Sequence, residues 1–257
     1  MASAPHLELD SADAIDGRQI RAAAFQDVRL EYVRTTLDRL GQDVRGRALV
    51  VGSGRGLLAR GLAGMGFAVT AHDPSARAVE LARDTAAREG LDIAHVTAPA
   101  EALGLSGSDF DLVYCADTFE TTHDLDAVIA QAAAALRPGG VLVYDTVNRT
   151  LVSRLIYLGA FQALPMTRIM PPGRYAADRL RTPGEVADVL RRHGLDAGEV
   201  CDFKPRDPKS LVAAVRARRQ GKITDAEIPP MVDFVLVPDG RPVVTYLGYA
   251  VKDALPG

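Results

Sequence analysis

Three glycines set two residues apart form the most chemically informative stretch of this chain. Gly52, Gly54 and Gly56 follow the apolar run that ends at Val51, and Asp73 ends the next apolar run, 21 residues after Gly52. Glycine lets the backbone approach a ligand because no Cβ stands in the way, and a carboxylate accepts hydrogen bonds from ribose hydroxyls. A strand, a glycine turn, a helix and an acid about 20 residues later predict a nucleoside pocket in an α/β sheet.

The spacing of the glycines distinguishes two classes of nucleoside pocket. A dinucleotide-binding turn usually reads G-x-G-x-x-G, with the helix N-terminus directed at a pyrophosphate. Here the turn reads G-x-G-x-G, and Asp73 is followed by Pro74. This combination resembles the S-adenosylmethionine (SAM) pocket of class I methyltransferases. A nicotinamide or flavin enzyme is the alternative that the glycine turn leaves open.

Two carboxylates, Asp117 and Glu120, follow the apolar run 110–115. Because they are three residues apart, they can share one face of a helical turn and offer oxygen ligands to Mg²⁺. His123 is a candidate general base for removing a proton from an acceptor hydroxyl. Helix-start carboxylates in a solvated loop and a solvent-facing histidine are the competing interpretations.

An alternation of strand and helix patterns positions these residues. It predicts a doubly wound, Rossmann-like α/β sheet. A helical pattern over residues 11–40 precedes the first strand, so residues 1–45 are expected to form an N-terminal helical cap on a single domain, 1–257. Strands are expected near 47–51, 67–72, 92–97, 110–115, 140–147, 197–203 and 243–251, and helices near 56–65, 75–89, 124–136 and 183–193.

Composition excludes several classes of protein. The net charge of −3 gives no global sign of nucleic-acid binding. Cys115 and Cys201 are too few for a disulfide framework and are expected to be buried thiols. The first residues do not resemble a signal peptide, and no apolar run is long and uncharged enough to span a bilayer. We therefore expect a cytoplasmic protein.

Several further segments resemble the O-methyltransferase family of ubiquinone biosynthesis, which acts on polyprenylated catechols and phenols. The resemblance runs from about residue 26 to residue 252. It implies a seven-stranded, mostly parallel sheet whose last strand is antiparallel. The segments that carry it, besides the glycine turn with Asp73, are Asp27-Val-Arg-Leu-Glu-Tyr-Val33, Tyr114-Cys-Ala-Asp-Thr-Phe-Glu120, Leu136-Arg-Pro-Gly-Gly140, Thr146-Val-Asn-Arg-Thr150, Pro171-Pro-Gly-Arg-Tyr175 and Thr182-Pro-Gly-Glu185.

The resemblance also implies which residues contact SAM. Arg29 would bind the methionine carboxylate, for which a guanidinium is well suited. Asp73 would hold the ribose hydroxyls, and Ala100 and Glu101 would lie beside the adenine. Backbone contacts would come from Gly52, Ser53, Gly54, Pro74 and Ala116.

Three positions depart from the family pattern. Val50 replaces an acid two residues before the first glycine, and Thr121 replaces a histidine that follows the two carboxylates. In the family the run with that histidine is associated with a divalent cation, so the resemblance makes Asp117 and Glu120 candidate Mg²⁺ ligands. Tyr175 replaces a histidine in the Pro-x-Gly turn and is expected to cap the acceptor pocket or to pack in the core.

Residues 150–182 and 204–240 are expected to be inserted lid or substrate elements. The apolar stretch 150–170 is compatible with a lid over an apolar acceptor, with peripheral contact to a membrane surface, or with a homodimer face. The basic residues within 206–222 would assist contact with anionic lipid.

The sequence as a whole predicts a SAM-dependent O-methyltransferase of a phenolic or quinol-like small molecule with an apolar body. Asp117, Glu120, His123 and Tyr175 are the candidate catalytic residues. N- or C-methylation of a small molecule, and a SAM-binding member of the fold that does not methylate, are the alternatives.

Overall fold

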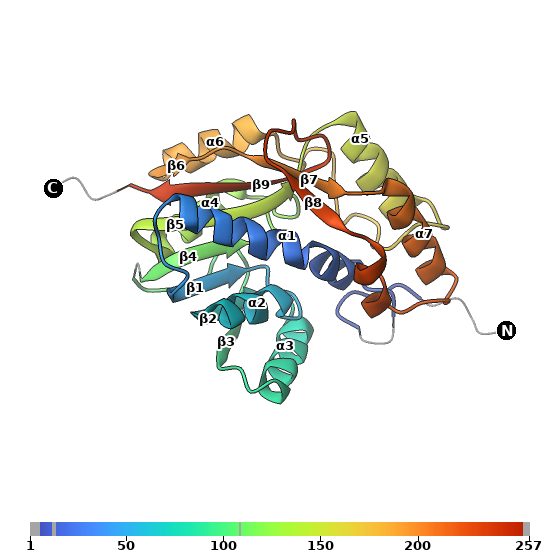
Figure 1. The fold of residues 1–257 in the computed structure, drawn as a ribbon, viewed down its shortest axis with the longest axis horizontal. Coiled ribbons are helices and arrows are strands. Elements are labelled where there is room, and N and C mark those ends of the chain that lie inside the picture. The colour runs from blue at the N-terminus through green and yellow to red at the C-terminus, as the bar shows by residue number, and fades with distance from the viewer. Residues whose placement is uncertain (1–5, 12–13, 108, 254–257) are drawn as a thin grey trace.

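Five parallel strands form the half of the sheet that carries the glycine turn. The computed structural model describes residues 6–11, 14–107 and 109–253. Within it the strand order is β3-β2-β1-β4-β5, and each of these neighbouring pairs is parallel (Figure 1). The strands are β1 (Gly46–Val51), β2 (Phe67–Asp73), β3 (Ile93–Thr97), β4 (Phe110–Cys115) and β5 (Leu136–Val147).

Antiparallel strands complete the other half of the sheet. β9 (Thr245–Lys252) runs antiparallel beside β5, and β7 (Cys201–Pro205) pairs with β9. The described residues form nine strands, where seven were expected. The strand expected near 197–203 is divided into β6 (Leu195–Ala197) and β7, with residues 198–200 between them outside any strand. A Cβ at Gly198 would collide with the ring of Tyr249. β8 (Phe234–Val237) adds an edge strand inside a segment that was expected to be an insertion.

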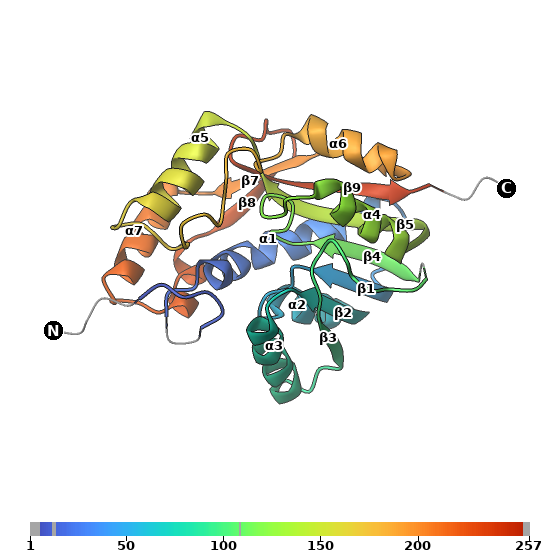
Figure 2. The same ribbon diagram turned by 180° about the vertical axis from the view of Figure 1, so that it is seen from behind.

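Helices cover both faces of the sheet, as the doubly wound prediction requires. Figure 1 shows α1 (Gly17–Arg39) and α2 (Leu57–Met65) on one face, and Figure 2 shows α4 (Leu125–Ala135) and α6 (Pro183–Arg192) on the other. α3 (Ala76–Arg88) lies against β2 and β3. Each face has its own buried apolar cluster, one containing Phe25, Val50 and Leu58, the other containing Leu49 and Ile129.

Local chemistry explains where the key helices begin. The Asp16 side chain accepts hydrogen bonds from the backbone of Arg18 and Gln19, which starts α1. Thr182 and Glu185 form a capping box at α6, with Pro183 as its first residue, as the sequence indicates. These caps set the direction in which α1 and α6 leave the sheet.

A third apolar cluster lies at the carboxyl ends of the parallel strands. It joins Ile15 and Ile20 near the start of α1 to Tyr157, Tyr175 and Val215. The elements of this region, all near one end of the molecule in Figures 1 and 2, are α5 (Leu151–Ser153), the π-helical stretch η1 (Arg154–Ala163), α7 (Pro208–Arg219), and the short 3-10 turns η2 (Asp225–Glu227) and η3 (Pro229–Met231).

Two predictions about composition can be compared with this fold. Cys115 and Cys201 are both buried and neither forms a disulfide, as expected. Among the described residues, no helix combines the length and the apolar character needed to span a membrane.

Candidate functional site

The glycine turn joins the carboxyl ends of three strands. Gly52 has φ +76, a conformation that L side chains rarely adopt, and a Cβ there would collide with the carbonyl oxygen of Ala116. The backbone N–H groups of Gly52 and Ser53 donate to the carbonyl of His72 at 2.9 and 3.0 Å. The turn therefore holds the ends of β1, β2 and β4 together.

Asp73, at the end of β2, is fully buried, and both of its carboxylate oxygens are engaged. Oδ2 accepts from Gly54 N at 2.8 Å and from Arg18 Nη2 at 2.5 Å. Oδ1 accepts from Ser75 N at 2.9 Å and from Arg18 Nη1 at 3.4 Å. Arg18 Nη1 also donates to Asp10 at 3.2 Å, so one guanidinium bridges two carboxylates.

Two cavities lie on either side of Arg18. The first, of about 20 Å³, is lined by Arg29 and the turn from Gly52 to Gly54, among others. The second, of about 170 Å³, is lined by Pro74, Ala100 and Glu101. Four residues line both cavities: Arg18, Gly52, Ala116 and Asp117.

A buried cluster of two arginines and three carboxylates adjoins the first cavity. Arg21 Nη2 lies 2.6 Å from Asp117 Oδ1 and 3.1 Å from Glu120 Oε1. Arg29 Nη2 lies 2.9 Å from the same Asp117 oxygen and 2.7 Å from Asp145 Oδ2. Arg21, Arg29, Glu120 and Asp145 are all buried. If every group is ionised, the cluster has one negative charge in excess.

The excess negative charge, together with burial, raises the pKa values of two of the three carboxyl groups. Burial raises the pKa of Asp145 to about 7, and the charges of Asp117 and Glu120 add to the effect. Burial, with the charge of Asp117, also raises the pKa of Glu120. Although burial opposes it, the guanidinium groups of Arg21 and Arg29 lower the pKa of Asp117 below its usual range. The cluster therefore holds an anionic Asp117 beside two carboxyl groups that bind a proton more tightly.

Asp117 connects the cluster to the two cavities. It follows β4 by one residue beyond Ala116 and has φ +50, a left-handed conformation that is uncommon outside glycine. Its carboxylate contacts both arginines, while the residue lines both cavities. Such strained positions are frequent at functional sites.

The family comparison agrees with this geometry. A family described as a methyltransferase domain matches residues 49–144. The ubiquinone biosynthesis O-methyltransferase of Sinorhizobium medicae is 32% identical over 183 residues, covering 68% of this chain and 73% of that protein. The enzyme of the same name from Xanthomonas euvesicatoria is 34% identical over 186 residues, covering 72% of this chain and 75% of that protein.

This chain is a SAM-dependent methyltransferase of that family. Solved structures agree on the fold. Magnesium protoporphyrin IX methyltransferase from Synechocystis, solved with S-adenosylhomocysteine (SAH), has a TM-score of 0.57 at 17% identity and covers 92% of this chain and 86% of its own. A SAM-dependent methyltransferase from Aquifex aeolicus has a TM-score of 0.56 at 15% identity, with coverage of 90% and 92%. These matches favour a methyltransferase over a nicotinamide or flavin enzyme.

The methyltransferase brings most of the predicted site residues together. Arg29, Gly52, Ser53 and Gly54 line the first cavity, and Pro74, Ala100, Glu101 and Ala116 line the second. Asp73 accepts a hydrogen bond from Arg18, and Arg18 lines both cavities. Tyr175 joins the buried cluster, because its hydroxyl accepts a hydrogen bond from Arg21 Nη1 at 2.6 Å. Val50 is fully buried in the apolar core.

His123 is not brought into this cluster. Its side chain is exposed, and the one polar contact found for it among the described residues is with Arg179, 3.5 Å away. The loop after β4 explains this placement. The backbone N–H groups of Thr121 and Thr122 both donate to the carbonyl of Thr118, which closes a turn that ends before His123.

The residues at the predicted Mg²⁺ site do not fit a divalent cation. The Arg21 guanidinium already lies at ion-pair distance from Asp117 and Glu120. Over the described ranges, no group of three or more His, Cys, Asp or Glu side chains is arranged to hold a metal ion. We therefore assign no step to a metal.

Arg18, Arg21 and Asp145 were missed from the sequence. Asp145 carried a usable signal, because a charged residue inside the mostly apolar run 141–147 is unusual for a central strand. Arg18 and Arg21 carried none, since arginines in an amphipathic helix normally lie on the solvated face.

Proposed function

We propose that this methyltransferase methylates the hydroxyl group of a phenolic or quinol-like small molecule with an apolar body. The observation that carries the proposal is the buried cluster, because its Asp117 lines both cavities and its Glu120, which shares Arg21 with Asp117, has a raised pKa. A phenol has a pKa near 10, so its methylation at neutral pH needs a group that accepts the proton. The names of the ubiquinone relatives support the same substrate class.

SAM supplies an electrophilic methyl group on a sulfonium, and the chain must hold that molecule in line with the acceptor. Two features of the chain fit it. Gly52 lines both cavities, and its conformation and close packing against Ala116 leave no room for a side chain. Arg29 lines the first cavity, and its Nε has no hydrogen-bond partner among the described residues. Arg29 would donate this N–H to the methionine carboxylate, and Asp73 would accept from the ribose.

In this proposal Glu120 is the base and Arg21 orients it. The acceptor hydroxyl loses its proton to Glu120 as its oxygen forms a bond to the methyl carbon. The carbon–sulfur bond breaks, SAH leaves, and the proton remains on Glu120. Thr146 Oγ1 donates to Glu120 Oε2 at 3.0 Å, which would fix the second oxygen of the base. Tyr175 would close the pocket through its contact with Arg21.

A panel of acceptors tests the proposed reaction. Catechol, phenol, aniline and thiophenol derivatives with and without an alkyl tail are incubated with SAM, and SAH and product masses are measured. We expect products methylated on oxygen, with tailed catechols fastest. Methylation of the anilines alone would instead establish an N-methyltransferase.

Arg18 is expected to compete with the ribose for Asp73. Both oxygens of Asp73 are engaged, so ribose hydroxyls reach it only if Arg18 withdraws toward Asp10. We expect Arg18→Gln to tighten SAH binding about 10-fold, since a hydrogen bond to a charged group contributes roughly 1.5–3 kcal/mol. Calorimetric titration measures this, with Arg34→Gln, exposed on the same helix, as the control. Weaker binding by Arg18→Gln would show that Arg18 contacts the cofactor instead.

The surface of α5 and η1 supports a peripheral membrane contact, which would suit an acceptor with an apolar body. Leu151, Leu155 and Met166 are 77%, 72% and 63% exposed, and large exposed apolar groups in one segment are uncommon unless they bind something. α7 packs beside this segment, with Arg219 Nε donating to the carbonyl of Pro165 at 3.2 Å.

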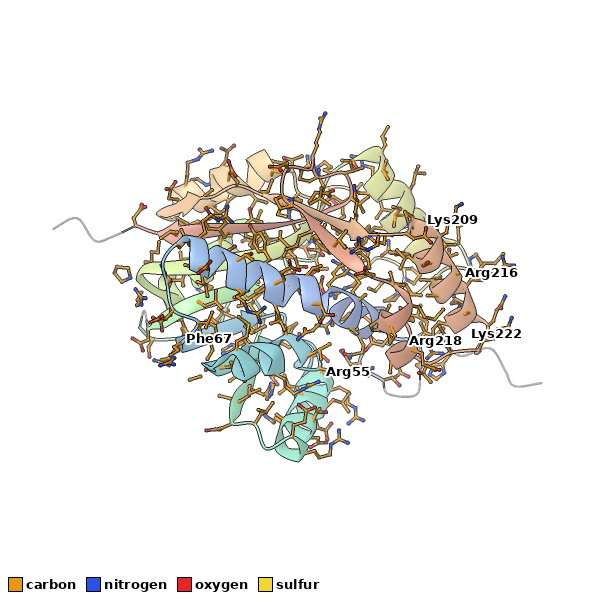
Figure 3. The ribbon with its side chains drawn as sticks, in the orientation of Figure 1. Arg55, Phe67, Lys209, Arg216, Arg218 and Lys222 are labelled. Carbon is orange, nitrogen blue, oxygen red and sulfur yellow. The ribbon has the colours of Figure 1, made fainter. Side chains whose placement is uncertain are left out.

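Basic side chains border the same surface. Figure 3 shows Lys209, Arg216 and Lys222 directed outward from the α7 region. Each basic residue near an anionic bilayer contributes about 1 kcal/mol. Charge complementarity therefore favours an anionic membrane as the occupant over a second copy of the chain.

Vesicle flotation tests the membrane contact. Wild type is expected to float with phosphatidylglycerol vesicles, and Leu155→Ser is expected to reduce the bound fraction several-fold, because burial of a leucine is worth about 2 kcal/mol. Leu105→Ser, at a half-exposed leucine before β4, is the matched control. Wild-type protein that stays unbound and elutes as a dimer, with Leu155→Ser eluting as a monomer, would contradict the membrane proposal and indicate the homodimer face.

A further inference from the structure

Arg21 occupies an unusual environment for an arginine. It lies in the second turn of α1 and is only 4% exposed. Its guanidinium carbon lies 5.2 Å from the ring centre of Phe25, 5.1 Å from that of Tyr157 and 5.7 Å from that of Tyr175. Three aromatic rings and two carboxylates therefore surround one cation in the interior.

The hydrogen-bonding capacity of Arg21 is only partly used. Nη1 donates to Tyr175, but Nε and Nη2 have no aligned acceptor among the described residues, although Nη2 is within ion-pair distance of Asp117 and Glu120. Leaving a buried N–H group without an acceptor is costly. The burial of the Arg21 guanidinium is therefore better explained if a bound molecule supplies an acceptor for Nε and Nη2. An oxygen anion is the partner that a guanidinium binds best.

We infer that Arg21, in place of a divalent cation, is the positive group that binds the acceptor oxygen. This inference rests on the proposed function. The two carboxylates three residues apart were candidate Mg²⁺ ligands, but the cation that lies between them is the Arg21 guanidinium of α1. Arg21 donates to the acceptor oxygen as that oxygen becomes anionic. Methyl transfer therefore requires no metal.

The ionisation of bound 4-nitrocatechol tests the inference, because the absorption of this compound reports whether its hydroxyl is deprotonated. The compound is bound to wild type with SAH present, and its apparent pKa is measured with EDTA or with Mg²⁺. We expect a pKa well below that of the free compound, and the same value in both buffers. A shift that needs Mg²⁺ would overturn the inference without any variant.

Variants add a second arm. Arg21→Gln is expected to abolish the shift and to slow methyl transfer about 100-fold, as for loss of one donor to a developing oxyanion. Arg21→Lys should retain part of the pKa shift and part of the methyl-transfer rate. Arg34→Gln should retain the full shift and the full rate. SAH titration confirms that each variant is folded. An unchanged shift in Arg21→Gln would refute the role of Arg21 alone, whereas a wild-type enzyme that does not bind nitrocatechol would refute the proposed function and this inference together.

Discussion

Glu120→Gln is expected to lower kcat for methyl transfer about 1000-fold while SAH affinity changes by less than about 3-fold. The substitution keeps the shape of the side chain but removes the group that accepts the hydroxyl proton, and a positioned base contributes about 10²–10⁴-fold. Burial raises the pKa of Glu120, so its carboxylate is a stronger base than a solvated one. Single-turnover rates with SAM and a tailed catechol provide the measurement.

The dependence of the methyl-transfer rate on pH is a second test of Glu120 as the base. A base acts only when it is deprotonated, so the wild-type rate should rise with pH through the raised pKa of the carboxyl cluster and level off above it. Burial raises the pKa of Glu120, so this rise is expected at a higher pH than for a solvated glutamate. Glu120→Gln should have a flatter profile. Glu80→Gln, exposed on α3, is the control, and a full rate in Glu120→Gln would exclude Glu120 as the base.

Asp73→Ala is expected to weaken SAH binding about 100-fold. Asp73 is fully buried, and its Oδ2 accepts from Gly54 N at 2.8 Å, so the carboxylate orients the glycine turn, and in this proposal it also accepts from the ribose once Arg18 withdraws. Two hydrogen bonds to a charged group contribute about 3 kcal/mol or more, which corresponds to about 100-fold in affinity. Calorimetry compares this variant with Asp84→Ala, an exposed aspartate on α3.

The Asp73 result distinguishes two accounts of the pocket. If affinity falls with Asp73→Ala and rises with Arg18→Gln, Arg18 and the ribose compete for one carboxylate. If SAH binds Asp73→Ala as tightly as wild type, the nucleoside does not use Asp73, and the cofactor site derived from the glycine turn is wrong.

The sequence predicts the parallel half of the fold well, because its signals are local. A glycine turn after a buried strand needs the left-handed backbone found at Gly52, and the following helix and strand need only their own periodicity. The antiparallel half was harder to predict. β8 has partly buried residues on both faces, so it lacks the alternation that identifies a strand.

The site was predictable where neighbours in sequence remain neighbours in space. Asp117 and Glu120 lie in one turn after β4, and the structure keeps them together through Arg21. Arg18 and Arg21 could not be found in the same way. Arg18 pairs with a carboxylate 55 residues away, and Arg21 donates to a tyrosine 154 residues away. α1 packs on the face formed by β1, β4 and β5, and this packing brings the arginines to their partners.

His123 lies apart from the cluster although it is close to it in sequence. It is three residues from Glu120 in sequence, and that spacing suggested a shared site. The turn closed by Thr121 and Thr122 ends first and leaves the imidazole at the surface, near Arg179.

The central claim is that the acceptor molecule binds at the buried cluster, next to the two cavities that hold SAM. A crystal structure with SAH and 4-nitrocatechol tests this claim most directly. We predict that the ribose is bound to Asp73 with Arg18 moved toward Asp10, and that a catechol oxygen contacts both Arg21 and Glu120 on the side facing the sulfur. A catechol bound away from these two residues, with Arg18 still on Asp73, would contradict the account.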